Sequence, residues 1–195
     1  MQDVFTKLRL WCSRNKRETA VLLAICVMLG LPWFISREET VGAAAAQRDL
    51  PIYNVKRDDK CVSLTFDAAW GNEDTQQLID TLNKYKVNAT FFVVGAWVDK
   101  YPESVRALAD AGNEVMSHSN DHAHFSQLSS EEIVKNVNTG NDKIEKVTGK
   151  RPTLFRCPYG ENDDHVIRTI KEMGITPIQW NVEALHRFGV KGSEA

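Results

Sequence analysis

The sequence predicts an α/β fold in which helices surround a parallel sheet, closed or open. From Lys60 onward, short apolar and β-branched segments alternate with longer amphipathic ones, which is typical of β/α units. Gly112, Gly149 and Gly174 stand where the amphipathic segments should end. Polar residues follow the ends of several predicted strands, and parallel β/α units bring such positions to one face.

The N-terminal segment predicts a membrane anchor. Basic residues between Lys7 and Arg17 precede an uncharged run at residues 19–36, which Arg37 closes. About 18 residues just cross a bilayer core of roughly 30 Å, and the basic flank favours a cytoplasmic N-terminus. We therefore expect a cytoplasmic segment at 1–18, a transmembrane anchor or uncleaved signal at 19–36, and a single-pass protein of the cell membrane with its domain outside the cell.

A cleaved signal peptide is the alternative, and it would make the protein secreted. The alanines at 44–46 resemble a cleavage site, and Gly30 with Pro32 can end the apolar helix early. We prefer the anchor because the charged residues 37–39 place those alanines far from the apolar run.

A linker is expected at residues 37–58 and a single folded domain at 59–195. Within this domain Ser129 and Glu132 have the spacing of a helix capping box. The expected strands are 61–66, 89–94, 114–117, 153–155 and 175–180, and the expected helices are 74–85, 102–111, 129–147 and 163–173.

Charge and cysteine usage exclude some classes of function. The net charge is -2 and both signs are interspersed, so nucleic acid is not an expected partner. The four cysteines have no metal-binding spacing. Export would permit a disulfide between Cys61 and Cys157, but two cysteines do not make a disulfide scaffold, and we expect both to be buried thiols.

The strongest chemical signal is the pair His118 and His122, directly after a predicted strand. A separation of four leaves both imidazoles on one side of the backbone, which suits a shared metal ion. A catalytic zinc usually takes three protein ligands, so the pair is one short, and alone it is compatible with a polar loop. Asp67, Arg156 and Tyr159 singly fit turn or surface roles, but they also follow strand ends and should converge on the histidines.

Four motifs carry a family resemblance: LTFDAAWG at 64–71, ATFFV at 89–93, HSNDH at 118–122 and RCPYG at 156–160. In this order they resemble the polysaccharide deacetylase family, carbohydrate esterase family 4, or NodB homology domain, over residues 60–185. The resemblance implies a deformed (β/α) barrel and an enzyme, a polysaccharide N-deacetylase. It would remove N-acetyl groups from a cell-wall or chitin-like polysaccharide such as peptidoglycan, with a divalent metal, usually zinc.

The resemblance also implies roles for individual residues. His118 and His122 would bind the metal, and Asp67 would be the general base. Arg156 would orient Asp67, and the backbone N–H of Tyr159 would help to hold the oxyanion. These roles suit amide hydrolysis, which needs an activated water, a proton acceptor and stabilisation of negative charge on the carbonyl oxygen.

The sequence departs from the family at the third metal ligand. The family has a second aspartate where this chain has Ala68, and a methyl group cannot bind metal. We therefore expect weaker metal binding than in the relatives. The replacement candidates are Glu73, Asp74, Asp121, His124 and Asp67 itself.

The later family motifs are also altered. The family has a D-x-x-D-W motif, and Glu183 can replace its first aspartate. His186 stands where the family has the aspartate that pairs with Arg156, and Arg187 stands where it has the tryptophan, so neither matches. No Leu-x-His general acid follows before Ala195. A closed barrel needs further strands after Trp180, so we expect a barrel incomplete at its C-terminus with an unpaired sheet edge. The alternatives to an active enzyme are a catalytically impaired glycan-binding relative and a non-functional truncated product.

Overall fold

The computed structural model describes residues 11, 13–18, 20–21 and 48–182, and the chain divides into one unit at Met1–Gln47 and another at Arg48–Ala195. In the first unit, most of the described residues are helical. Apart from Ala20 and Val21, the predicted anchor at 19–36 lies outside the described residues, as do residues 183–195. Within the described ranges, no helix combines the length and the apolar character that a membrane span requires.

The second unit is built on a five-stranded sheet in which each strand pairs in parallel with the next along the chain. The strands are β1 (Thr65–Ala68), β2 (Thr90–Val93), β3 (Glu114–Ser117), β4 (Leu154–Phe155) and β5 (Thr176–Pro177). This sequential order is that of consecutive strands in a β/α barrel. The predicted α/β class and parallel sheet are confirmed.

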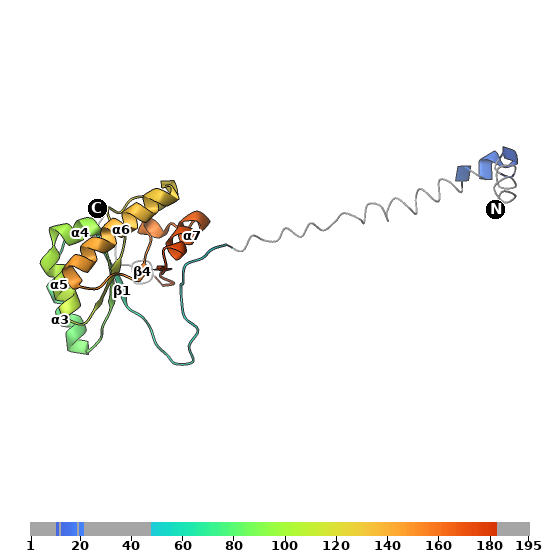
Figure 1. The fold of residues 1–195 in the computed structure, drawn as a ribbon. Coiled ribbons are helices and arrows are strands. Elements are labelled where there is room, and N and C mark those ends of the chain that lie inside the picture. The colour runs from blue at the N-terminus through green and yellow to red at the C-terminus, as the bar shows by residue number, and fades with distance from the viewer. Residues whose placement is uncertain (1–10, 12, 19, 22–47, 183–195) are drawn as a thin grey trace. The chain divides into compact units, whose positions relative to one another are not determined.

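Five helices connect these strands and pack on one another in a row, as Figure 1 shows. They are α3 (Thr75–Tyr85), α4 (Gly95–Lys100), α5 (Pro102–Asp110), α6 (Ser130–Thr148) and α7 (Asp164–Glu172). Two short 3-10 helices, η1 (Phe125–Gln127) and η2 (Pro158–Gly160), follow β3 and β4. The helix α4 was not predicted, because it is only six residues long and no side chain caps its N-terminus.

The longest helix, α6, has the predicted capping box. The Ser129 hydroxyl accepts the Glu132 N–H at 3.3 Å, and the Glu132 carboxylate accepts the Ser129 N–H at 2.8 Å. The helix ends at Gly149, whose φ of 73° is in the left-handed region that favours glycine.

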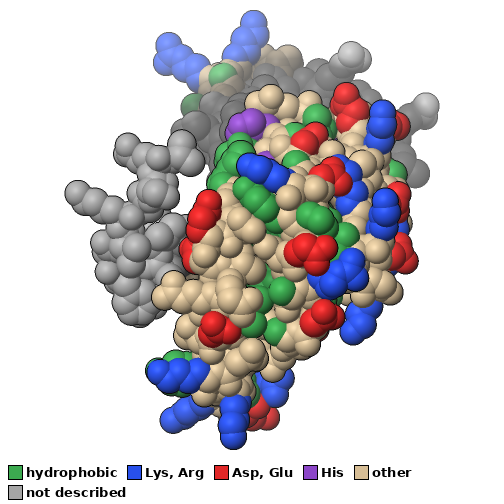
Figure 2. All heavy atoms as spheres, turned by 90° about the vertical axis from the view of Figure 1, so that its left-hand side faces the viewer, with side chains coloured by type: hydrophobic (Ala, Val, Ile, Leu, Met, Phe, Trp, Pro, Cys, Tyr) green, Lys and Arg blue, Asp and Glu red, His purple; other side chains and the backbone are tan. Residues whose placement is uncertain are grey.

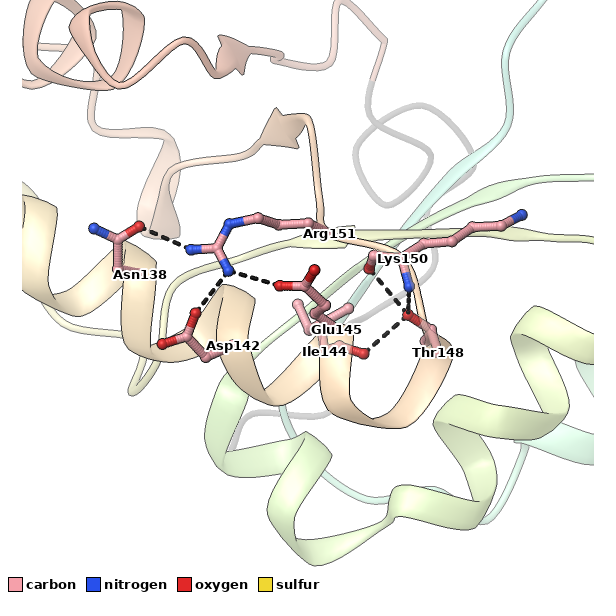
Figure 3. Close-up of polar contacts among 7 residues, drawn as sticks. All are labelled: Asn138, Asp142, Ile144, Glu145, Thr148, Lys150 and Arg151. Carbon is pink, nitrogen blue, oxygen red and sulfur yellow. Dashed lines mark hydrogen bonds and ion pairs between the residues drawn. The ribbon is translucent and has the colours of Figure 1, made fainter.

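An ion network fixes the segment that leaves α6 toward β4. Arg151 donates to Asp142 at 2.6 Å, to Glu145 at 2.8 Å and to Asn138 at 3.0 Å (Figure 3). All of these contacts are exposed to solvent, where ion pairs contribute little stability. The network therefore sets the path of the chain more than the stability of the domain.

Strand β2 is buried on both faces and divides the interior in two. Phe91 and Val93 pack into an apolar cluster with residues of α3, α4 and α5, whereas Phe92 lies on the opposite face. A second apolar cluster joins β4 to α6 and α7 through Phe155, Val137 and other residues. Both clusters lie between sheet and helices, so the opposite face of the sheet carries Phe92 together with the polar residues described below.

The folded unit begins before the predicted boundary at residue 59. Ile52 pairs with the β5 segment, donating its N–H to the Pro177 carbonyl at 2.9 Å and accepting from the Gln179 N–H at 2.9 Å. Asp49 forms ion pairs with Lys171 at 3.1 Å and Arg168 at 3.4 Å on α7. The sheet edge at β5, which the sequence predicts to be unpaired, is thus covered at one position by Ile52, within the predicted linker.

The two described cysteines of the domain are both free. Cys157 is buried, as predicted, and burial raises the pKa of its thiol far above the usual value. The prediction of a buried thiol at Cys61 is wrong, because β1 begins only at Thr65 and Cys61 lies in an exposed turn. There its thiol donates to the Asp59 carboxylate at 3.0 Å.

Candidate active site

The parallel sheet brings the predicted polar residues to the C-terminal ends of three strands. Asp67 is the penultimate residue of β1, His118 directly follows β3, and Arg156 directly follows β4. In the register, Ser117 pairs with Phe155, so the two residues after them leave the sheet side by side. The expected convergence of these side chains is confirmed.

A buried arginine holds the carboxylate of Asp67. Arg156 is 2% exposed and donates from Nη1 to Asp67 Oδ1 at 2.7 Å and from Nη2 to Thr65 Oγ1 at 3.0 Å. Its guanidinium lies 4.1 Å from the ring centre of Phe92 and 5.6 Å from that of Trp180. The guanidinium therefore places a positive charge beside the Asp67 carboxylate.

His118 is held in one tautomer by the same segment. Its Nδ1 lies 2.8 Å from the carbonyl oxygen of Arg156, which can only accept, so Nδ1 carries the proton and Nε2 keeps its lone pair. The ring is 3% exposed, and this burial lowers the pKa of His118, although the negative charge of Asp67 opposes the shift. His118 is therefore neutral near pH 7, as a metal ligand must be.

His122 lies beside His118, with ring centres 5.1 Å apart. Burial also lowers the pKa of His122, and the charge of Asp67 again opposes the shift. The Nδ1 atom of His122 is buried and has no hydrogen-bond partner among the described residues. An imidazole nitrogen left unpaired in this way suits an incoming ligand such as a metal ion.

Backbone strain is concentrated in this site. Four non-glycine residues in the described part have positive φ, and three of them, Ser119 (76°), His122 (59°) and Tyr159 (58°), lie here. Such conformations cost about 1–3 kcal/mol each and persist where the surroundings enforce them, often at functional sites. The Ser119 hydroxyl accepts the His122 N–H at 2.9 Å and so stabilises the turn between the two histidines.

Two glycines of neighbouring helices provide the space for this turn. The Gly95 and Ala96 N–H groups at the start of α4 donate to the Ser119 and Asn120 carbonyls at 2.9 and 2.7 Å. A Cβ atom on Gly140 of α6 would lie only 2.9 Å from the Ser119 carbonyl oxygen. Sequence reasoning missed this contact, for which the glycine inside a long predicted helix was the only available signal.

Tyr159 lies in the 3-10 turn η2, and its ring meets that of His122 edge-on with centres 4.6 Å apart. The turn is closed by the N–H groups of Gly160 and Glu161, which donate to Cys157 and Pro158. These bonds use the neighbouring N–H groups and not that of Tyr159.

The structure distinguishes the candidates for a third metal ligand by their partners and their effect on the histidines. Asp121 accepts from Asn136 at 2.7 Å, and His124 is paired with Glu161 at 2.7 Å. Asp74 occupies the N-terminal capping position of α3, where its side chain makes no capping hydrogen bond, and the Glu73 carboxylate lies against Gly71. Among the five candidates, only Asp67 acts electrostatically on both histidines.

The donor set fits a divalent transition metal only in part. Two neutral imidazoles supply two nitrogen ligands, but the described residues contain no group of three His, Cys, Asp or Glu side chains arranged to hold a metal. Ala68 packs against the apolar cluster on the helix side of the sheet and offers no ligand. Any metal held here would rest on His118 and His122, with Asp67 as the nearest carboxylate.

Comparisons with known proteins identify relatives of this chain. Residues 54–178 match the family model described as polysaccharide deacetylase. The chain is 41% identical over 129 residues to the peptidoglycan-N-acetylmuramic acid deacetylase PdaC of Bacillus subtilis, covering 66% of this chain and 27% of that protein. It is 33% identical to a peptidoglycan-N-acetylglucosamine deacetylase of Bacillus cereus, covering 66% of this chain and 60% of that protein.

Solved structures give the same result. BA3943 from Bacillus anthracis, described as a CE4 family pseudoenzyme, matches with a TM-score of 0.65 and 35% identity, covering 68% of this chain and 47% of that one. The structure of PdaC matches with a TM-score of 0.59 and 41% identity, covering 66% of this chain and 62% of that one. This chain thus spans less than two thirds of the relatives compared here. By its sequence and its parallel sheet, the chain belongs to the polysaccharide deacetylase family.

Proposed function

We propose that this protein catalyses metal-dependent hydrolysis of N-acetyl groups on a cell-wall polysaccharide, with peptidoglycan favoured by the names of its relatives. The observation that carries the proposal is the carboxylate of Asp67, which buried Arg156 holds beside His118 and His122. The products are the free amine on the sugar and acetate.

Each residue has a step that its position supports. His118, through Nε2, and His122 would hold a divalent ion, with zinc expected, and that ion would activate water and polarise the acetyl carbonyl. Arg156 engages Oδ1 of Asp67, so Oδ2 is the atom that takes the proton from the attacking water. The Tyr159 N–H would donate to the oxygen that becomes negative.

The test is acetate release from an N-acetylglucosamine oligosaccharide and from peptidoglycan by the full chain supplied with zinc. We expect release that His118→Ala abolishes and that His165→Ala leaves intact. His165 is a matched control because it lies on α7 and contacts the Leu128 carbonyl instead of the site. If zinc-supplied protein released no acetate, the hydrolytic function would be refuted.

A catalytically impaired, glycan-binding role is the second candidate. It is favoured by Ala68 at the position of the missing ligand and by the similarity to a protein described as a pseudoenzyme. It predicts retention on insoluble peptidoglycan without acetate release. If the protein neither bound nor hydrolysed peptidoglycan, both candidates would be excluded.

We further propose that the domain acts outside the cell, held at the membrane by residues 19–36. The support is the uncharged run with its basic N-terminal flank, and secretion after cleavage is the alternative. Protease added to intact cells should degrade the domain, and the domain should sediment with membranes. Resistance to the protease would contradict export, and recovery in the medium would favour secretion.

A further inference from the structure

Trp70 is an exposed aromatic residue at the mouth of the site, and the proposed chemistry does not use it. It lies two residues after β1, its side chain is 70% exposed, and its ring centre is 5.8 Å from that of His122. An indole left in water forgoes the stabilisation that burial would provide. The packing of the described residues gives no reason for this exposure.

The backbone below Trp70 is firmly fixed. The indole N–H of Trp97 donates to the carbonyl oxygens of Trp70 and Gly71 at 3.1 and 2.6 Å. Trp97 itself is 3% exposed and forms part of an apolar core cluster. The Trp70 ring is thus presented to solvent from a rigid base, and a ligand would not need to order the loop before binding.

Tyr159 presents a second exposed ring to the same histidine. It is 57% exposed and contacts the His122 ring at 4.6 Å. On its other side it stacks on His124, with ring centres 4.1 Å apart and planes 12° apart, and the carboxylate of Glu161 holds His124. The Tyr159 ring is therefore supported from behind.

The two rings share a neighbour but have no ring contact with each other among the described residues. Both exposed rings therefore lie next to the His122 ring. Clustered exposed apolar surface of this kind marks ligand sites, and tryptophan and tyrosine combine an apolar face with a polar edge. A pyranose ring has the same character, with C–H groups on its faces and hydroxyl groups around its edge.

We propose that Trp70, with Tyr159, forms an aromatic platform that stacks on pyranose rings of an N-acetylated glycan next to His122. The choice of ligand rests on the proposed function, because the acetyl group must reach the histidines. Trp70 then governs glycan binding and not the hydrolytic step. Its loss should weaken binding and raise KM while kcat changes little.

The experiment is a titration of the full chain, labelled with 15N in its indole groups, with a tetramer of N-acetylglucosamine. The protein has five tryptophans, and the Trp70 signal is identified by its absence in Trp70→Phe. We expect this signal to shift on binding. Trp70→Ala should weaken binding on the order of 10-fold, the usual effect of truncating a central tryptophan, and Trp70→Phe should retain most of the affinity.

The matched control is Tyr85→Ala, because Tyr85 is 68% exposed but lies at the end of α3. It should leave the affinity unchanged. An unshifted indole signal of Trp180 verifies that the Trp70 variants are folded. Equal affinity of wild type and Trp70→Ala, or no binding by the wild type, would overturn the platform.

Acetate release measured on the same samples separates this proposal from the proposed function. Binding that depends on Trp70 without acetate release supports the platform and refutes the hydrolytic function. Acetate release with the same KM in wild type and Trp70→Ala refutes the platform and supports hydrolysis.

Discussion

Replacing Asp67 with alanine should destabilise the domain, because it leaves the Arg156 charge buried without its partner. The arginine side chain is 3% exposed, and its guanidinium lies 4.1 Å from the ring centre of Phe92 and 5.6 Å from that of Trp180. Thr65 would remain as a single neutral acceptor at 3.0 Å. A buried charge with only this partner is costly.

The size of the effect follows from the burial of the pair. Breaking a fully buried ion pair costs about 3–5 kcal/mol. The Asp67 side chain is 31% exposed, so solvent screening should lower the cost to about 2–3 kcal/mol. For the folded residues 48–182, this corresponds to a fall in melting temperature of roughly 6–12 °C.

The control is Asp142→Ala, which removes a carboxylate from Arg151 on the surface (Figure 3). That contact is shorter, at 2.6 Å, but its side chains are 41% and 67% exposed. We expect a cost of about 0–1 kcal/mol. Calorimetric melting of both variants is the assay, and equal losses of stability would refute the argument that burial decides the contribution of the pair.

Three further variants test other parts of the structure. Ser129→Ala should lower the free energy of unfolding by about 1 kcal/mol in urea denaturation, and an unchanged value would contradict the capping box. Gly140→Ala should lower the free energy of unfolding by about 1–3 kcal/mol, because the added Cβ meets the Ser119 carbonyl. An unchanged free energy of unfolding would contradict the close contact. Burial lowers the pKa of His118 from 6.5, so its contribution to stability is present above pH 6.5 and is lost as pH falls through the lower folded value. Wild type should therefore lose more stability than His118→Gln between pH 7 and 5, and equal losses would contradict this assignment.

Figure 2 shows basic and acidic side chains interspersed over one face of the domain, as their spacing in the sequence predicts. Other features that follow from local chemistry were also predictable. The ends of α6 follow from Ser129, Glu132 and Gly149, and the convergence of strand ends follows from the parallel order.

Features that depend on contacts between distant residues could not be predicted. β1 begins at Thr65 and not at Cys61, because the paired register with β2 begins at Thr65 and only the Leu64 carbonyl, which accepts the Thr90 N–H, extends it. The pairing of Ile52 with β5 and the contact of Gly140 with Ser119 are equally long-range. The surroundings of Arg156 were also hidden, since strand alternation does not reveal which side chain lies opposite Phe92.

Asp67 is the carboxylate whose charge acts on both histidines, and zinc affinity tests how far that charge supports metal binding by the pair. Asp67→Asn keeps the side-chain volume and an oxygen acceptor for Arg156 but removes the negative charge that acts on both histidines. Loss of a carboxylate that binds or orients a metal site typically weakens affinity about 10–100-fold, so calorimetric titration with zinc should show a loss of that size. The matched control is Asp121→Asn, which also removes a negative charge next to His122. The Asp121 carboxylate accepts a hydrogen bond from Asn136 at 2.7 Å, so we do not expect it to serve as the metal ligand. If Asp121→Asn weakened zinc binding more than Asp67→Asn, the third ligand would come from the histidine loop, and Asp67 would be free to act only as the base.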